Sequence, residues 1–427
     1  MEHLLFAAYL VLFAWLVTKV KFFKDSGLSP AQLIIVFLLK VMAGIFYGWI
    51  GVYYGELAQM VDTWAYHYES LREYELLRSN PPEFFRSIFR NTYEGGYEKF
   101  LSTENSWWND LKGTFLVKIM ALLNLLSTGH YYINVVFYSF ISLFGPVAVY
   151  RVMRDIFPAN RMAVLLATFL VPSFLYWTSG IHKDGLIFVG FGLIVYHFYF
   201  GFKDSRWPWH RILFILLGLI LVLALRNFLI ITIIPALIAW AVCRKLRYPP
   251  IVIYLAIYAL FILFFFTARY VDPRLDFPEA VAVRQQEFLQ LRGGSAVAVD
   301  RIEPTLHSFI VNAPQAFSLS VLRPYPGDVR HLLSLAASLE INFLLLLFVA
   351  FLVWRKKQTG LTPFMLFCIF LSFSLLMMIG YTVNFLGAIV RYRSLVLPFL
   401  VIPVMAQIDW KRVSSFLTND IKNKNNM

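Results

Sequence analysis

The sequence has little of what cross-links or charges an ordinary soluble protein. Only two of its 427 residues are cysteine, Cys243 and Cys368, and both lie in or beside apolar runs. Two such cysteines exclude a disulfide framework and a zinc cluster with the usual cysteine and histidine spacing. Charged residues make up 15% of the chain, far below their share in soluble domains.

Signature motifs of several large enzyme classes are also missing. The sequence has no P-loop, no GxGxxG dinucleotide motif, no HExxH zinc motif and no GxSxG nucleophile motif. The sequence therefore does not indicate a P-loop nucleoside triphosphatase, a Rossmann oxidoreductase, a zincin or an α/β-hydrolase. No internal repeat is visible either, although many transporters are built from repeated halves.

Apolar residues dominate what is present, because 59% of the chain is hydrophobic and 18% is aromatic. Such a composition is typical of polytopic membrane proteins. A helix needs about 20 apolar residues to cross the bilayer core. On this basis we predict an all-α transmembrane bundle of about eleven spans, at residues 4–20, 31–54, 130–150, 162–179, 185–202, 212–226, 228–243, 250–269, 332–354, 361–383 and 394–409.

These spans predict one transmembrane body over residues 1–409, followed by a cytoplasmic polar tail over residues 410–427. The first run is not read as a signal peptide, because Glu2 and His3 stand where a basic segment belongs and no small-residue cleavage site precedes the lysines. Residues 114–128 are apolar but short, which favours a helix lying in the membrane interface.

The net charge of +13 is distributed unevenly among the loops. With the N-terminus outside, the inner segments carry nineteen Lys and Arg against five acidic residues, whereas the outer loops 55–113 and 271–330 hold more acids than bases. This bias predicts an outer N-terminus and a cytoplasmic C-terminus. The basic inner segments are residues 19–30, 151–161, 203–211, 244–249, 355–360 and 409–427.

The first outer loop begins with VDTWAYHYE, residues 61–69, and carries two candidate site residues. Asp62 is a candidate general base that draws a proton from an attacking hydroxyl; the alternative is a solvated acid near a helix N-terminus. His67 is a candidate substrate ligand, or else a hydrogen-bonded surface histidine. Farther along, one face of a helix on the bilayer surface, or of an amphipathic connector, can be formed by Phe84, Phe85, Ile88 and Phe89.

Charged residues also gather where later spans reach the same face. Lys183 and Asp184 form the polar turn of PSFLYWTSGIHKDGL, and Arg226 lies between two spans with almost no loop. A lysine and an arginine at such positions suit a phosphate group, and guanidinium binds phosphate oxygens in a bidentate manner. The alternatives are a snorkelling helix cap and a simple charge at a hairpin.

Arginine is frequent on this face toward the end of the chain as well. The loop at 271–330 has six arginines and no lysine, and prolines on both sides of Tyr325 hold Arg323 at a defined place. Arg391 and Arg393 precede the last span; on a helix they diverge, whereas on an extended or kinked segment both can face a cavity. Structural ion pairs are the alternative for the arginines of the 271–330 loop.

These motifs resemble those of the GT-C class of multi-spanning glycosyltransferases, which use polyprenyl-phosphate-linked sugars. VDTWAYHY resembles the acid-bearing start of the first outer loop of that class, PSFLYWTSGIHKDGL its polar turn, and IVRYRSLVLPFL its Arg-rich approach to a late span. The resemblance implies that Asp62 is the catalytic base and that Lys183, Arg226, Arg391 and Arg393 meet the lipid phosphate. It covers the architecture of most of the chain, but a complete span precedes the span leading to Asp62, which departs from the family pattern.

The resemblance predicts transfer of a sugar from a polyprenyl-(di)phosphate to a glycan or lipid acceptor at the outer face of a bacterial inner membrane, for cell-surface polysaccharide synthesis. The expected partners are membrane lipid, the lipid-linked sugar and the acceptor, with no nucleic acid. A divalent cation, Mg²⁺ or Mn²⁺, held by Asp62 and another carboxylate stays open, and no other cofactor is expected. Alternatives are a polysaccharide polymerase similar to the Wzy or EpsG type and a transporter or flippase of a lipid-linked solute.

Overall fold

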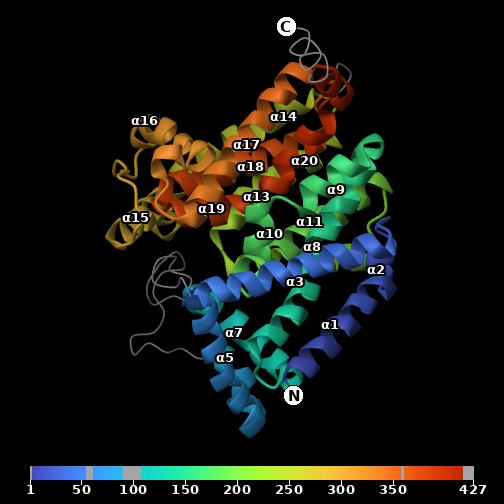
Figure 1. Ribbon diagram of the computed structural model, residues 1–427. Helices are drawn as coiled ribbons and strands as arrows, with labels where there is room; N and C mark the ends of the chain where they lie inside the picture. The colour runs from blue at the N-terminus through green and yellow to red at the C-terminus, as the bar shows by residue number, and fades with distance from the viewer. Residues whose placement is uncertain (1, 54–60, 90–106, 357–359, 417–427) are drawn as a thin grey trace.

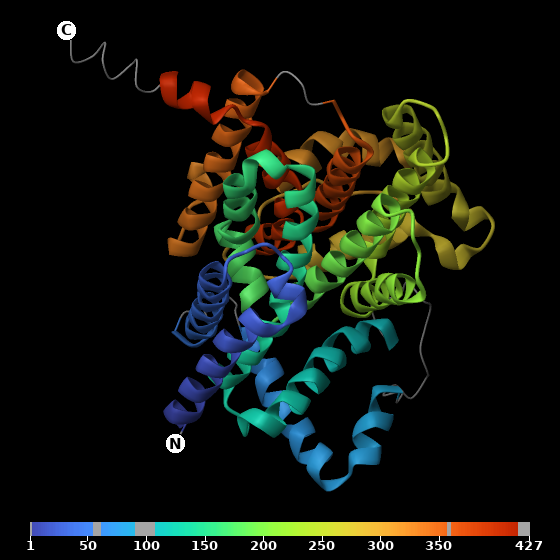
Figure 2. The ribbon, with the colours of Figure 1, turned by 90° about the vertical axis from the view of Figure 1, so that its right-hand side faces the viewer.

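The computed structural model describes residues 2–53, 61–89, 107–356 and 360–416, and this part of the chain is built of helices. Its only extended pairings are two isolated bridges, between Ala296 and Phe385 and between Arg355 and Ile408. The predicted all-α, polytopic class is therefore confirmed. Helices from the first third of the chain, blue to cyan, lie below those of the last third, orange to red, in both views (Figure 1 and Figure 2).

Seven helices in the described residues are long and apolar enough to cross a membrane. They coincide with seven of the predicted spans. These helices are α1 (Glu2–Lys19), α3 (Pro30–Tyr53), α8 (Tyr131–Ile156), α11 (Lys183–Lys203), α14 (Pro250–Thr267), α17 (Leu332–Trp354) and α18 (Pro363–Thr382).

The other four predicted spans are not single full-length helices. Two are bent pairs: α9 (Arg161–Phe169) meets α10 (Pro172–Ser179) at 54°, and α19 (Leu386–Ser394) meets α20 (Leu397–Gln407) at 63°. Proline lies at the start of α10 and of α20, where its fixed φ and missing N–H favour a new helix.

The remaining two are short helices, α12 (Trp209–Leu225) of 17 residues and α13 (Phe228–Cys243) of 16. The described residues thus give seven full-length candidate spans, or nine if each bent pair is one span, and α12 and α13 are shorter apolar helices at the other two predicted positions.

The short helix α10 is held at both ends by buried ionisable side chains from other helices. Lys40 of α3 donates to the carbonyl of Thr178 at 2.9 Å, at the C-terminal end of α10. Glu340 of α17 accepts from the backbone N–H of Ser173 at 2.6 Å, at the N-terminal end. A cation at the negative end of the helix dipole and a carboxylate at the positive end both stabilise it. The two rare charges inside the membrane therefore fix a broken helix.

The basic segments predicted to lie inside are linked to one another on a single face. Arg154 contacts Ser26, and Lys203 pairs with Asp155. Likewise, Lys356 reaches Asn160, Arg244 lies over the Phe202 ring, and the backbone N–H of Asp409 donates to Trp354. The described parts of all six segments thus share one face, since Phe202 and Trp354 directly precede two of them. Helices α2 (Lys21–Lys24) and α9 belong to this face, at the right of Figure 1. Which side of a membrane that face meets stays a prediction.

The opposite face carries the helices of the two predicted outer loops. Residues 61–89 form α5 (Val61–Ser79), α6 (Pro81–Arg86) and a 3₁₀ turn, and the second loop contains α15 (Phe277–Gln290) and α16 (Leu306–Phe317). Helices α15 and α16 lie at the left of Figure 1, and α5 lies below them, left of the centre.

The helix predicted for the membrane interface is part of α7 (Trp107–Ser127), which packs against α5. Its Lys118 is buried and binds Glu73 at 2.5 Å. Phe84 packs beneath the same ammonium group, whereas Phe85 and Phe89 are exposed, so Phe84 does not share the predicted apolar face with them.

Candidate functional site

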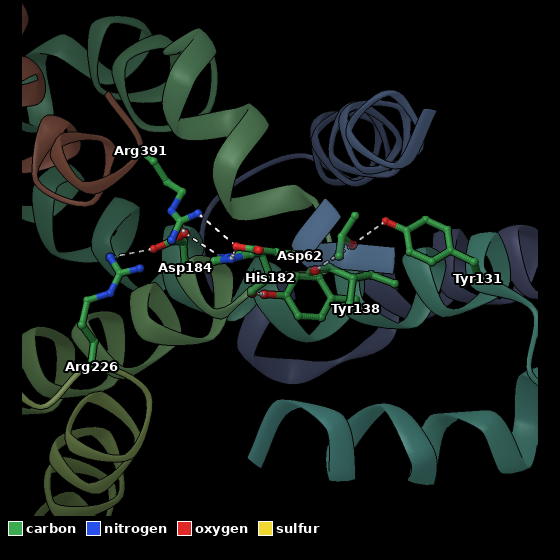
Figure 3. A network of polar contacts seen from close by, with 9 residues as sticks. Asp62, Tyr131, Tyr138, His182, Asp184, Arg226 and Arg391 are labelled. Atoms are coloured by element: carbon green, nitrogen blue, oxygen red, sulfur yellow. Dashed lines mark hydrogen bonds and ion pairs between the residues drawn. The ribbon is translucent and has the colours of Figure 1, made fainter. Parts of the chain in front are cut away.

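Five ionisable side chains from four elements meet where the first and last thirds of the chain come together (Figure 3). Asp62 is on the first turn of α5, and His182 and Asp184 flank the start of α11. Arg226 directly follows α12, and Arg391 is in the last turn of α19. Segments more than 300 positions apart in the sequence therefore supply one polar cluster.

Asp184 is the centre of this cluster and its side chain has no exposed surface. Its Oδ1 atom lies 3.0 Å from Nη1 of Arg226. Its Oδ2 atom lies 2.9 Å from Nδ1 of His182 and 3.4 Å from Nε of Arg391. An uncompensated buried carboxylate costs several kcal/mol, so these three partners are what keeps Asp184 ionised at this depth.

Asp62 lies on the other side of the same histidine and arginine, with about half of its side chain exposed. Its Oδ2 atom is 3.7 Å from Nε2 of His182 and 3.7 Å from Nη1 of Arg391. Interaction with the His182 ring, aided by the charges of Arg391 and Lys183, lowers the pKa of Asp62 to about 2 although partial burial opposes this. The carboxylate is therefore ionised throughout the neutral range.

The turn before α11 is held by hydrogen bonds to its backbone carbonyls. Thr63 donates its hydroxyl to the carbonyl of Ile181 at 2.9 Å, and the Tyr138 hydroxyl donates to the carbonyl of His182. Position 185, directly after Asp184, requires glycine, because a Cβ on Gly185 would lie 2.6 Å from the carbonyl oxygen of Thr178. The turn is thus fixed against α5 and α8, which sets the direction of the His182 and Asp184 side chains.

A cavity of about 470 Å³ opens beside the cluster, with one charged end. Asp62, Lys183, Arg226, Arg284 and Arg391 line that end. Most of the remaining wall is apolar or aromatic and comes from α12, α13, α14, α15 and α18. This wall includes Leu223, Phe228, Ile231, Phe265, Phe277 and Phe288.

Aromatic rings hold several of the cations at the charged end. The guanidinium of Arg226 lies 4.1 Å from the ring centre of Tyr392, and that of Arg391 lies 5.7 Å from the ring centre of Trp177. The ammonium of Lys183 lies 5.1 Å from the ring centre of Tyr66. Such contacts stabilise a cation while leaving its edge available to an anion.

The structure brings together most of the residues predicted from sequence. Asp62, Lys183, Arg226 and Arg391 all line the cavity, and Asp184 lies directly behind them. Arg391 and Arg393 both lie on helix α19, where their side chains diverge as predicted for a helix, and only Arg391 lines the cavity.

The three other predicted residues make contacts elsewhere. His67 is buried, with its ring 5.4 Å from that of Tyr131, and burial lowers its pKa to about 4. Arg323 pairs with Asp328 at 3.5 Å. Arg393 is 2% exposed and donates to the carbonyls of Ser320 and Arg323.

No pattern in the sequence indicates His182 or Arg284 as a site residue. His182 is adjacent to Lys183 in the polar turn that we had identified, but a single histidine gives no signal of two carboxylates from distant segments around it. Arg284 belongs to the arginine-only loop, and only the packing of α15 against α18 brings it to the cavity.

Arginine side chains lie beside both carboxylates of this site: Arg226 and Arg391 beside Asp184, and Arg391 beside Asp62. In the described residues, no group of three or more His, Cys, Asp or Glu side chains is arranged to hold a metal ion. The divalent cation therefore stays a prediction. Comparison with protein families, with curated proteins and with solved structures finds no match for this chain.

Proposed function

We propose that this protein is a membrane glycosyltransferase that moves a sugar from a polyprenyl-(di)phosphate to a glycan or lipid acceptor. One observation carries the proposal: Asp62, Lys183, Arg226 and Arg391 line the same cavity, whose remaining wall is largely apolar. A molecule with an anionic head and a long hydrocarbon tail fits both halves of such a cavity.

The cations suit a leaving phosphate. In the reaction, the bond between the anomeric carbon and the phosphate oxygen breaks, and its electron pair goes to the phosphate. Negative charge then develops on that oxygen, where Arg226, Arg391, Lys183 and Arg284 can stabilise it with little reorganisation because ion pairs and ring contacts already hold them.

Of the two carboxylates, Asp62 and Asp184, only Asp62 is half-exposed and can therefore receive a proton from an incoming acceptor hydroxyl. The acceptor hydroxyl forms the new bond to the anomeric carbon, and its proton goes to a carboxylate oxygen of Asp62. A carboxylate with a pKa of about 2 is a weak base toward a free hydroxyl. It therefore takes the proton late, after bonding to the electron-poor carbon has made that hydroxyl acidic.

The proposal locates the reaction at the outer face of a bacterial inner membrane. Its support is the Lys and Arg bias, because the described parts of the six basic segments share the face opposite the cavity and basic loops stay in the cytoplasm.

The test is transfer by the purified full-length chain in lipid vesicles, offered a panel of labelled undecaprenyl-phosphate sugars. We expect Asp62→Asn to reduce transfer by about 10²- to 10⁴-fold, the usual contribution of a general base. Asp272→Asn is the matched control, since Asp272 pairs with Arg274 away from the cavity and should leave transfer unchanged. Equal activity of the two variants, or no transfer from any undecaprenyl-phosphate donor, would reject the proposal.

A polysaccharide polymerase is the second candidate, and one observation favours it. Arg284 comes from the arginine-only loop and lines the cavity, as expected if this loop binds a second lipid diphosphate. In that case Arg284→Gln should impair product elongation more than Asp62→Asn. A transporter is less well supported, because Lys40 and Glu340, charges that it would need within the membrane, bind the backbone of α10.

A further inference from the structure

A second cavity, of about 310 Å³, lies on the face opposite the site, at the other end of α8. Three arginines line it: Arg151 and Arg154 from the last turns of α8, and Arg161 from the start of α9. The site described above contacts the first turns of α8, through Tyr131 and Tyr138. Twenty helical residues, or about 30 Å, separate Tyr131 from Arg151.

Two of these guanidinium groups are held in place by the protein. Arg154 donates through Nη1 to the carbonyl of Ser26 at 2.6 Å, and Arg151 donates through Nη1 to the carbonyl of Phe22 at 3.3 Å. Arg151 also lies 4.8 Å from the ring centre of Tyr196. Arginine has five N–H donors, so each of the two keeps further donors for an anion in the cavity.

The turn that contains Gly27 leaves space for the guanidinium of Arg154. Gly27 has a φ of +81°, which favours glycine, and a Cβ at this position would lie only 1.3 Å from Nη1 of Arg154. The backbone therefore leaves space for a guanidinium at this point. Arg161 contrasts with Arg154, because its side chain is exposed at the start of α9.

Acidic residues do not cancel this charge. Asp155 also lines the cavity, but it binds Lys203 at 2.6 Å and the hydroxyl of Tyr199 at 2.7 Å. Asp25 is the other carboxylate of the lining. Three arginines with Lys203 against two aspartates leave a positive balance at a cavity large enough for a phosphate group.

We propose that this cavity binds a phosphate group, supplied either by the headgroup of an anionic phospholipid or as free phosphate. Fixed arginines with spare donors bind phosphate oxygens in charge-assisted pairs. The cavity lies at the ends of two candidate membrane helices, α8 and α11, on the face that carries the basic segments. Basic pockets between membrane helices on such a face bind lipid headgroups. This binding is independent of the reaction proposed above.

The test uses the full-length chain purified in detergent, with native mass spectrometry to count bound lipid. Phosphatidylglycerol is compared with phosphatidylcholine at equal concentration, and inorganic phosphate is titrated separately while thermal unfolding is followed. Arg161→Gln is the test variant because its exposed side chain makes a folding defect unexpected, and Arg161→Glu reverses the charge. Arg247→Gln is the matched control, an exposed arginine on the same face outside the cavity.

We expect Arg161→Gln to weaken phosphatidylglycerol binding about tenfold, as for loss of one hydrogen bond to a charged group, and Arg161→Glu to abolish it. Arg247→Gln should change binding less than twofold. Preferential binding of phosphatidylglycerol assigns the cavity to a lipid headgroup, whereas stabilisation by inorganic phosphate alone assigns it to a free anion. The proposal would be overturned if Arg161→Gln and Arg247→Gln had equal effects. It would also be overturned if phosphatidylglycerol bound no better than phosphatidylcholine and inorganic phosphate did not stabilise the protein.

Discussion

Arg391 and Arg393 stand two positions apart on α19 and serve different parts of the structure. Arg391 lies 3.4 Å from Asp184 and 3.7 Å from Asp62 at the cavity. Arg393 instead donates to the carbonyls of Ser320 and Arg323, at 3.1 and 2.8 Å, and so ties α19 to the end of the second loop. Residues two apart on a helix point about 200° away from each other, which accounts for the difference.

Lysine substitutions should separate these two roles. Arg391→Lys keeps a charge but loses the planar fork, so we expect transfer to fall at least tenfold with little change in thermal stability. Arg393→Lys removes buried bonds to carbonyls, so we expect a loss of about 1–3 kcal/mol of unfolding free energy. The measurements are initial rates and thermal midpoints in one detergent. Arg412→Lys, an exposed control on the opposite face, should change neither. If Arg393→Lys lowers the rate while the midpoint is unchanged, Arg393 acts on substrate after all.

Arg226 and Asp184 should show strong energetic coupling, because both are buried and their charged atoms lie 3.0 Å apart. Arg226→Met alone leaves Asp184 with one close partner fewer, and we expect a loss of about 3–5 kcal/mol. Adding Asp184→Asn should recover part of this loss, since a neutral amide needs no counter-charge. A double-mutant cycle of unfolding free energies measures the coupling. Strictly additive losses would mean that the pair does not interact in the folded protein.

The stabilising effect of the Asp62 charge should depend on pH only in strong acid. Its pKa is lowered to about 2 in the folded protein, so its contribution is complete above the unfolded value near 4 and is lost as pH falls through 2. We therefore expect the difference in thermal midpoint between the wild type and Asp62→Asn to be constant from pH 5 to pH 8. Thermal unfolding at half-unit intervals checks this. A difference that fades between pH 7 and pH 5 would show that the carboxylate titrates there and that its pKa is raised.

Two helical glycines should respond in opposite directions to alanine. A Cβ on Gly380 of α18 would lie 2.0 Å from the carbonyl oxygen of Ala316 in α16, whereas a Cβ on Gly113 of α7 would have no atom of the described residues within 4 Å. Gly380→Ala should therefore cost about 1–3 kcal/mol by overpacking, and Gly113→Ala should add up to about 1 kcal/mol through helix propensity. The thermal midpoints of the two variants test both expectations. If Gly380→Ala left the midpoint unchanged, α16 and α18 would have to be farther apart than described.

Long apolar runs were sufficient to predict the helices, but not where they bend. Residues 162–179 read as one span, yet the chain turns by 54° before Pro172. Proline at the first position of a helix was a usable local signal. Its geometric effect was not predictable, because Lys40 and Glu340, which bind the two ends of α10, come from helices far away in the sequence.

The candidate site was predictable to the extent that charge at the ends of apolar runs is rare. Asp62, Lys183, Arg226 and Arg391 were selected on that ground, and they share one cavity. The same criterion selected Arg393 and Arg323, which contact each other instead. Sequence spacing reports which residues reach a face of the membrane, whereas tertiary packing decides which of them meet. For this reason His182 also escaped selection.

Helix α8 contacts the polar turn before α11 at one end and carries the arginine-lined cavity at the other. When the bilayer is thinner than the length of this helix, the protein accommodates the mismatch mainly by tilting, at a modest cost in free energy per ångström. Tilting would rotate the mouth of the 470 Å³ cavity relative to the layer from which the proposed lipid-borne donor would arrive. Acyl-chain length of the host membrane is therefore expected to govern how readily a donor enters, independently of its sugar.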